Sequence, residues 1–473
     1  MLHRVLSAHL ATFLARVEAD ETRAGLPRRV RRELTAFLRC GILAYGFARV
    51  HCASCGKDAL VAFSCKGRGF CPSCGARRMA EAAAHLVERV LPEVPVRQWV
   101  LTMPWRLRFL LASDPALCAA VRRTFLRAVL ASYRERAARD GIPAGRTGSV
   151  TVVQRFGSAL NLNVHFHALV LDGVYTSAGP LAQPEFHTAE ELEPEEVERL
   201  VRTVRERILR LLRRRGLLPA AGEERDSAQP EELLPQGLLP FLAAASIQGR
   251  IALGPDSGRP IERRGRPTCP TRTAPRSQPG RLCAAQDGFS LHAEVRVESH
   301  ARQRLEHLCR YVLRPPIATE RLSLADDGKV VYALRHPWRD GTAEIVFDPL
   351  TFLERLAALV PRPRAHLLTY HGVLAPASDW RDWIVPAAAP AKASAVADPP
   401  RASAPERMRW AELMRRVFEL DVLRCEHCGG RRKLIALIQD PFVARRILEH
   451  LGLPSEPPPV APARAPPQGV LTF

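Results

Sequence analysis

The segment VHFHALVL, residues 164–171, places the strongest constraint on the fold of this chain. Its apolar and histidine positions alternate, and residues two apart on a β-strand point to the same face of a sheet. His165 and His167 therefore share one face, while the opposite face carries Val164, Phe166, Ala168 and Val170. Imidazole nitrogen is a good ligand for Mn²⁺ and other divalent cations. By itself, a His-x-His strand is more often structural than catalytic. The neighbouring elements therefore decide which role is favoured here.

Further strands and helices surround this segment. Gln98–Met103 (QWVLTM) reads as a strand ended by Pro104, and Ser149–Phe156 (SVTVVQRF) reads as a hairpin partner of residues 164–171. A second hairpin is predicted from Lys329–Leu334 and Ala343–Phe347. Helical patterns cover residues 1–46, 79–92, 114–138, 189–216 and 299–314. The pattern predicts an α+β fold.

Charge points to the class of partner. The chain has 473 residues, is 47% hydrophobic and has a formal net charge of +20. This excess favours a polyanion over a neutral small molecule. No apolar run approaches the length of a membrane helix. The first 21 residues are amphipathic and carry Arg16 and Glu18, so they read as a helix of a cytoplasmic protein and not as a secretory signal.

Two C-x₂-C pairs predict a structural zinc site. Cys52 and Cys55 are followed by Gly56, and Cys71 and Cys74 by Gly75, with 15 residues between the pairs. This is the spacing of a four-thiolate zinc ribbon, in which each tight turn aims two sulfurs at one ion. Cys40 and Cys65 lie nearby; either could replace a ligand, but packing as small hydrophobic residues is the favoured reading.

A third pair lies near the C-terminal end. Cys425 and Cys428 are followed by two glycines and form half of a metal site. His427 or His450 could add a third ligand, but no fourth is evident, and whether this pair binds metal stays open.

The helical segment RLEHLCRYVLR, residues 304–314, carries the most promising nucleophile. Leu305, Leu308, Cys309 and Val312 form a core-facing stripe, and two prolines end the helix. Tyr311 lies beside this stripe, so its hydroxyl can reach the edge of the sheet near the two histidines. The alternative is an interface tyrosine that merely makes a hydrogen bond. Among the other five tyrosines, Tyr370 lies in a polar cluster that could also serve the site.

These segments together resemble the rolling-circle transposases of the IS91 type, within the His-hydrophobe-His (HUH) endonucleases. The resemblance is carried by FSCKGRGFCPSCGARRM (63–79), RQWVLTMPWRLR (97–108), NVHFHALVLDGVY (163–175), LCRYVLRPPIATERL (308–322) and LVPRPRAHLLTYHGVLAP (359–376). It implies a ferredoxin-like antiparallel sheet with helices, preceded by a zinc ribbon that binds DNA. It also implies cleavage of single-stranded DNA through a 5′-phosphotyrosine, with Mg²⁺ or Mn²⁺ as the catalytic ion, in a cytoplasmic protein associated with the nucleoid.

The residues and the resemblance together suggest a role for each side chain. Tyr311 is the expected nucleophile, and His165 and His167 the expected ligands of the catalytic metal. A third ligand is expected among His307, Glu306, His292 and Gln154. Some relatives carry a second tyrosine four residues before the first; His307 occupies that position here, which favours the single-tyrosine branch. Arg310, Arg314 and Trp105 are expected to contact DNA by phosphate binding or base stacking.

The expected organisation has five parts, and rival functions remain. The parts are a helical and zinc-ribbon DNA-binding domain (1–92), a nuclease domain (93–385), a linker (386–406), a small C-terminal module (407–453) and a disordered tail (454–473). The nuclease domain is expected to contain a helical and disordered basic insertion at about 176–287. The sequence contains no Walker A motif, so no nucleotide cofactor is expected. The alternatives are a replication initiator or relaxase with the same chemistry, and a non-catalytic zinc-ribbon DNA-binding protein.

Overall fold

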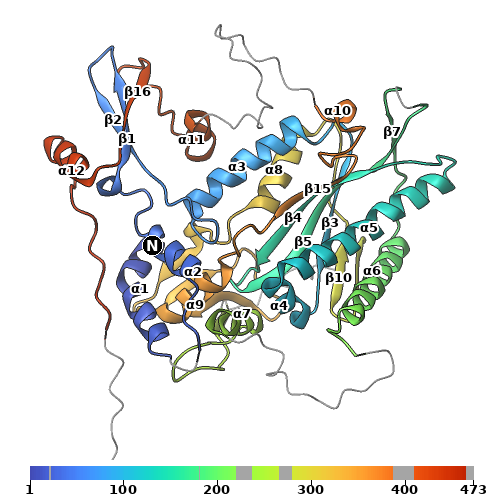
Figure 1. Ribbon diagram of the computed structural model, residues 1–473, viewed down its shortest axis with the longest axis horizontal. Helices are drawn as coiled ribbons and strands as arrows, with labels where there is room; N and C mark the ends of the chain where they lie inside the picture. The colour runs from blue at the N-terminus through green and yellow to red at the C-terminus, as the bar shows by residue number, and fades with distance from the viewer. Residues whose placement is uncertain (21–22, 180–181, 220–236, 266–279, 387–409, 465–473) are drawn as a thin grey trace, which may run out of the picture.

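A computed structural model gives the structure of the chain. It describes residues 1–473 except 21–22, 180–181, 220–236, 266–279, 387–409 and 465–473. Helices and antiparallel sheets are mixed, which confirms the predicted α+β class (Figure 1). No described helix is long and apolar enough to cross a bilayer.

The central sheet has the ferredoxin-like strand order. Its core elements in chain order are β3 (Val96–Thr102), α5 (Pro115–Arg139), β4 (Gly148–Phe156), β5 (Leu162–Leu171), α6 (Pro194–Arg214) and β10 (Phe289–His292). The strands lie in the order β10-β3-β5-β4, and every neighbouring pair is antiparallel. Two β-α-β units are thus interleaved, as in the ferredoxin-like motif. Further strands extend this sheet: β15 (Leu368–Gly372) beside β4, β9 (Cys283–Gln286) beside β10, and β11 (Arg296–Val297) beside β3.

The two faces of the sheet are covered by different helices. Val164, Phe166, Ala168 and Val170 share a core with α5, α6 and α4 (Trp105–Ser113). On the other face, Leu169 and Leu171 pack with α3 (Pro72–Arg89) and α8 (Arg302–Leu313). The period-two alternation of β5 therefore places both histidines on the face that α8 covers.

Local sequence explains where these elements begin and end. The Asp114 side chain accepts hydrogen bonds from the backbone N–H groups of Ala116 and Leu117, and so caps α5. Pro315 and Pro316 come directly after Arg314, the C-cap residue of α8, and cannot continue the helix. The stripe predicted for α8 is buried: Leu305, Leu308, Cys309 and Val312 all belong to the core under the helix.

A second sheet packs against the N-terminal helices. It has the order β12-β13-β14-β8, and the β13–β14 pairing confirms the predicted second hairpin. Its apolar side chains share one core with four helices. The strands are β8 (Glu262–Gly265), β12 (Leu322–Leu324), β13 (Val330–Ala333) and β14 (Thr342–Phe347), and the helices are α1 (Leu2–Glu18), α2 (Arg28–Phe37), α7 (Leu238–Gln248) and α9 (Pro349–Leu359).

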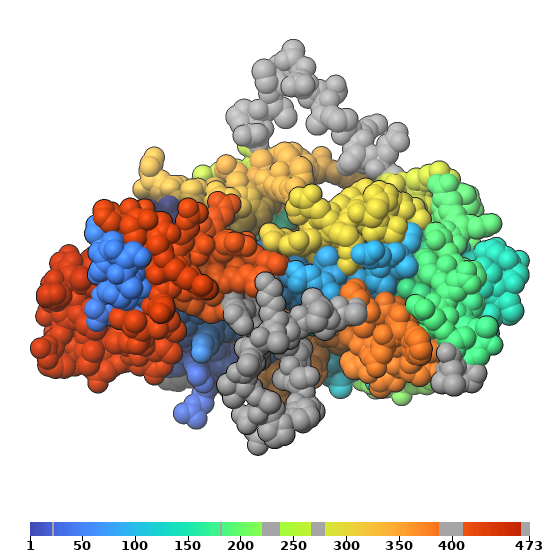
Figure 2. Space-filling view, turned by 90° about the horizontal axis from the view of Figure 1, so that it is seen from above, coloured from blue at the N-terminus to red at the C-terminus, as the bar shows by residue number. Residues whose placement is uncertain are grey.

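A third sheet joins the two ends of the chain. β1 (Phe47–Cys52) forms a hairpin with β2 (Asp58–Ala62), and its other edge pairs with β16 (Arg432–Ile438). Figure 2 shows these red and blue segments side by side. Two C-terminal helices flank the sheet, α11 (Trp410–Phe418) against α3 and α12 (Pro441–His450) against the short helix η1 (Leu43–Tyr45). The expected C-terminal module is thus continuous with the expected N-terminal zinc region.

Several expected segments lie partly outside the described residues. The expected linker 386–406 does so apart from Pro386. The expected insertion is described at residues 176–179, 182–219, 237–265 and 280–287, where it contains a short hairpin of β6 (Gly173–Thr176) and β7 (Glu185–Thr188), α6, α7 and β8. In the expected tail, Ala461 N donates to Ser7 O (2.9 Å), so residues 454–464 reach α1.

Candidate active site and thiolate clusters

His165 and His167 lie side by side on β5, in the centre of the sheet. Their ring centroids are 4.9 Å apart, and both side chains are buried, with exposed fractions of 8% and 3%. Burial lowers the pKa of His165 to about 4 and that of His167 to about 2. Both imidazoles are therefore neutral at physiological pH, which is the form that binds metal ions.

The hydrogen bonds of the two rings leave one nitrogen of each available. His165 Nδ1 lies 2.9 Å from the carbonyl oxygen of Asn163 and therefore donates to it, which leaves Nε2 unprotonated. His167 Nδ1 is 2.8 Å from the side-chain Nε2 of Gln98 on β3. His167 Nε2 is buried and makes no hydrogen bond. As the amide is placed, Gln98 Nε2 donates to Nδ1, which puts the ring proton on His167 Nε2. Exchanging the amide oxygen and nitrogen of Gln98, which have nearly the same shape, lets Nδ1 donate instead and leaves a lone pair on Nε2, the arrangement typical of metal-binding histidines.

Tyr311 projects from α8 over this pair. Its ring meets the ring of His167 edge to face, with centroids 6.1 Å apart and an interplanar angle of 85°. The side chain is 43% exposed, so the hydroxyl-bearing ring is accessible from solvent while its edge touches the site. The structure thus brings together the three residues that the sequence singled out for chemistry.

Of the two arginines expected at the site, Arg314 contacts Tyr311 and Arg310 does not. The Arg314 guanidinium lies 4.1 Å from the centre of the Tyr311 ring and donates to the Tyr311 carbonyl oxygen. Arg310 instead forms an ion pair with Glu306 on its own helix (2.7 Å). Trp105 is 45% exposed at the start of α4, beside Arg106.

Of the candidate third ligands, Gln154 is the best placed. It lies directly opposite His165 in the β4–β5 register and is buried, and its side-chain Oε1 has no hydrogen-bond partner. Its Nε2 donates to the Val312 carbonyl oxygen at the end of α8 (2.7 Å). His307 is exposed, and His292 contacts Cys283 on the sheet edge. Among the described His, Cys, Asp and Glu side chains, none completes a three-ligand group with the two imidazoles.

The remaining tyrosines lie away from the pair. Tyr133 is buried and donates to Asp172, and Tyr332 is buried in the second sheet. Tyr370 lies on β15 opposite Val150, with its ring beside Arg381. Only Tyr311 makes a ring contact with either histidine of the pair in the described part of the chain.

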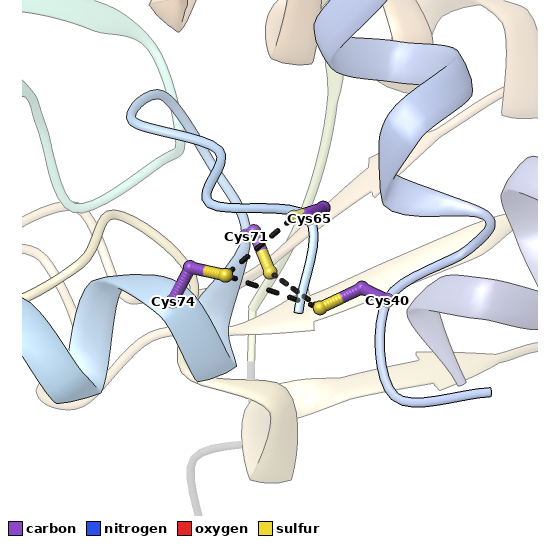
Figure 3. A group of neighbouring side chains, drawn as sticks. All are labelled: Cys40, Cys65, Cys71 and Cys74. Atoms are coloured by element: carbon purple, nitrogen blue, oxygen red, sulfur yellow. Dashed lines mark hydrogen bonds between the residues drawn. The ribbon is translucent and has the colours of Figure 1, made fainter. Parts of the chain in front are cut away.

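The expected four-cysteine site is not formed as the sequence spacing suggested. Cys71 and Cys74, at the N-terminus of α3, lie with Cys40 and Cys65 (Figure 3). The β1–β2 hairpin carries Cys52 and Cys55 away to a second group. Cys40 and Cys65, expected to be packing residues, are thus members of the first group.

The first group has the geometry of a tetrahedral thiolate site. Its sulfur–sulfur distances include 3.7 Å (Cys40–Cys71), 3.9 Å (Cys40–Cys74) and 3.5 Å (Cys65–Cys74). Four sulfurs at about 2.3 Å from one zinc ion are about 3.8 Å apart. The backbone N–H of Gly67 also lies 3.3 Å from the Cys65 sulfur, which is the kind of second contact that stabilises a metal-bound thiolate.

Two regions of the chain match known protein families. Residues 5–103 match the family described as "Transposase zinc-binding domain", of the IS91 type, and residues 148–380 match the family described as "Putative transposase". Together the two matches span most of the chain. It belongs to the IS91-type transposases. No curated protein and no solved structure matches it.

The transposase has a basic cavity beside the histidine face. The cavity has a volume of about 350 Å³ and lies between the zinc-binding domain and the sheet. Four arginines line it, Arg68, Arg78, Arg155 and Arg314, and no described lining residue is acidic. Burial lowers the pKa of Arg155 to about 10, and its Nε has no hydrogen-bond partner. A polyanion would stabilise arginines that lie so close together. DNA, on which a transposase acts, is such a polyanion.

Sequence reasoning missed two residues near the histidines of the transposase. The sequence pattern predicts Gln98 only as part of a strand. It lies on the same face of the sheet as the two histidines, and a buried glutamine in an apolar strand usually makes a hydrogen bond. Arg108 lies one turn into α4. Burial lowers the pKa of His165 most, and the charges of Arg314 and Arg108 lower it further. Nothing in the local pattern of Arg108 distinguishes it from Arg106, the other arginine of that helix.

Proposed function

We propose that the transposase nicks and rejoins single-stranded DNA at transposon ends through a covalent 5′-phosphotyrosine on Tyr311, as a rolling-circle enzyme. The contact between the Tyr311 and His167 rings carries this proposal. It places the only tyrosine of α8 at a pair of buried imidazoles.

The donor set fits a divalent cation. His165 and His167 each offer one nitrogen, and the buried, unpartnered Nε2 of His167 needs a partner that the described protein atoms do not provide. We assign the third ligand to Gln154, because its Oε1 is likewise buried and unpartnered. Mg²⁺ or Mn²⁺ bound there would neutralise charge on the oxygens of a scissile phosphate.

The side chains around the cation would do the remaining work. The phenolic oxygen of Tyr311 attacks phosphorus, the bond from phosphorus to the 3′ oxygen breaks, and that oxygen takes up a proton as a 3′-hydroxyl. The Arg314 guanidinium holds the Tyr311 ring and adds positive charge next to the phosphate. The reverse attack by a 3′-hydroxyl rejoins the strand without ATP, since the phosphotyrosine conserves the bond energy.

One nucleophile serves both steps. α8 carries His307 one turn before Tyr311, and His307 cannot form the second phosphotyrosine of a two-tyrosine cycle. The chain is therefore assigned to the single-tyrosine branch. Single-stranded DNA would follow the basic cavity between the zinc-binding domain and the sheet, where arginine contacts to phosphate do not require a duplex.

Structural zinc is assigned to Cys40, Cys65, Cys71 and Cys74. The group lies within the residues that match the zinc-binding family, and three of its sulfur–sulfur distances fit a tetrahedral ion. It fixes the N-terminus of α3, the helix that lies beside α8 on the histidine face.

The direct test is incubation with labelled single-stranded DNA from the element's ends. In the presence of Mn²⁺ the full-length protein should form a covalent adduct with the strand on the 3′ side of the nick and release a free 3′-hydroxyl. His167→Ala should abolish the adduct and leave DNA binding largely intact, because phosphate contacts dominate affinity. Cleavage without covalent protein, or normal cleavage by His167→Ala, would contradict the proposal.

Gln98 gives a test of the metal site that leaves the proposed ligands in place. Gln98→Leu removes the hydrogen bond to His167 Nδ1 and should raise the Mn²⁺ concentration for half-maximal cleavage by roughly 10- to 100-fold. Cleavage at saturating Mn²⁺ should recover. Gln286→Leu, on the edge strand β9, is the matched control and should not change the Mn²⁺ requirement. Equal Mn²⁺ requirements for both variants would remove Gln98 from the site.

A further inference from the structure

The second cysteine group is assembled from both ends of the chain. Cys52 and Cys55 lie in the turn of the β1–β2 hairpin, and Cys425 and Cys428 lie in the turn that leads into β16. Cys52 Sγ is 3.5 Å from Cys428 Sγ, and Cys55 Sγ is 3.6 Å from Cys425 Sγ. All four sulfurs lie within 4.8 Å of one another.

The two turns have the same backbone structure. Gly56 N donates to Cys52 O (2.8 Å), and Gly429 N donates to Cys425 O (2.9 Å). The first cysteine of each turn then donates to the residue five positions later, Cys52 to Lys57 O (2.9 Å) and Cys425 to Gly430 O (2.8 Å). Both glycines have φ of +72°, which a side chain would disfavour. Two matching C-x₂-C-G turns that face each other are the halves of a zinc ribbon.

We propose that Cys52, Cys55, Cys425 and Cys428 bind one zinc ion, which closes β16-β1-β2 into a zinc ribbon made from the two ends of the chain. Thiolates select zinc among the common divalent cations, and the sulfur spacing fits the edge of about 3.8 Å of a tetrahedral ZnS₄ site. Disulfide-bonded sulfurs would be about 2.05 Å apart. Cys425 and Cys428 lie outside both family matches, so neither match includes this site.

The local packing explains why a metal is needed here. Among the described residues, the hydrophobic cluster between the hairpin and α12 contains three fully buried side chains, those of Phe47, Ala444 and Leu448. Leu434, Ile435 and Leu437 on β16 are half exposed or more. An apolar cluster of this size does not stabilise a small unit by itself, and a structural ion commonly does so.

Counting zinc in paired-cysteine variants tests the proposal. We expect native mass spectrometry of the full-length protein, prepared without Mn²⁺ and without added oxidant or reductant, to show two zinc ions per chain. Cys52→Ser/Cys55→Ser and Cys425→Ser/Cys428→Ser should each retain one zinc ion. The variant with all four replacements should also retain one, because both pairs bind the same ion. Cys118→Ser, in α5, is the control and should retain two.

The outcomes that overturn the proposal are distinct. The proposal is overturned if Cys425→Ser/Cys428→Ser binds as many zinc ions as the wild-type chain. Loss of a further ion when the two pairs are combined would mean that they bind separate ions. A wild-type mass lower by four hydrogens, with no second zinc, would indicate disulfides instead.

Hydrogen exchange gives a second readout that does not depend on counting ions. In Cys425→Ser/Cys428→Ser, the β16 amides that pair with β1 should exchange at least about tenfold faster, because the ion no longer fastens this edge strand. The amides of β4 and β5 should keep the wild-type rates, which would show that the nuclease sheet is folded. Unchanged exchange in β16 would contradict a stabilising ion at this position.

Discussion

Tyr311→Phe should reduce the covalent protein–DNA adduct by more than roughly three orders of magnitude, the scale seen when an enzyme loses its nucleophile. Phenylalanine keeps the ring that contacts His167 and that lies under the Arg314 guanidinium. Because the side chain is 43% exposed, stability should change by no more than about 0.5 kcal/mol. The measurement is adduct formation with labelled single-stranded DNA, together with the DNA dissociation constant, which should stay near the wild-type value.

Two other tyrosines provide controls for Tyr311→Phe. Tyr45 is 38% exposed, so Tyr45→Phe matches the change in exposure but lies far from the histidines in the fold. Tyr370→Phe removes a hydroxyl from β15, the strand that pairs with β4, and should at most lower the rate of adduct formation. An adduct peptide that contains any tyrosine other than Tyr311 would refute the assignment. Adducts on two tyrosines would show that the chain does not belong to the single-tyrosine branch.

Asp172→Asn should cost about 3–5 kcal/mol of stability, which is typical when one partner of a buried ion pair is removed. Asp172 is 1% exposed and accepts from Arg97 Nε (2.9 Å), Tyr133 Oη (2.7 Å) and Arg296 Nε (2.6 Å). It thereby connects β3, α5 and β11 at the end of β5. Asparagine keeps the volume but leaves the Arg97 guanidinium buried without its counter-charge.

The pH dependence of stability gives the same residue a second signature. Burial alone would raise the pKa of Asp172, but the hydrogen bonds and charge of Arg97, with Tyr133 and Arg296, hold it below its usual value. A lowered folded-state pKa means that this stability is fully present above the unfolded pKa of about 3.9 and is lost as the pH falls through the folded pKa. Asp172→Asn should therefore remove part of the acid sensitivity of unfolding.

The matched control for Asp172→Asn is Asp379→Asn. Asp379 pairs with Arg146, but both side chains are more than half exposed, so its loss should cost no more than about 1 kcal/mol. Urea unfolding followed by circular dichroism compares the two variants. A midpoint shift for Asp172→Asn no larger than that for Asp379→Asn would refute the role of the buried carboxylate.

Local periodicity predicted much of the sheet and the arrangement around Tyr311. The alternation of β5 predicted which face carries His165 and His167, and the apolar stripe of α8 predicted that Tyr311 lies at the rim of its buried surface. Both patterns work because a strand or helix presents its faces at a fixed period. The roles of these residues stay predictions until the adduct is mapped.

The same reasoning could not predict which cysteines share a metal site. A C-x₂-C spacing says which two sulfurs share a turn, but not which pairs of turns meet in space. Cys55 meets Cys425 across 370 residues, while Cys71 and Cys74 meet the single cysteines Cys40 and Cys65. Tertiary contacts decide such partners, as they decide that Gln98 meets His167 from a neighbouring strand.

The pairing of β1 with β16 also fixes an order of events during translation. Cys52 and Cys428 are 376 residues apart, so at 5–20 residues per second the ribosome makes the second roughly 20 to 75 seconds after the first. Until then β1 and β2 form a two-stranded hairpin, which is marginally stable in water. The first strands to leave the ribosome are therefore among the last to be completed, and a transposase truncated before β16 would contain the whole nuclease sheet but only part of its N-terminal sheet.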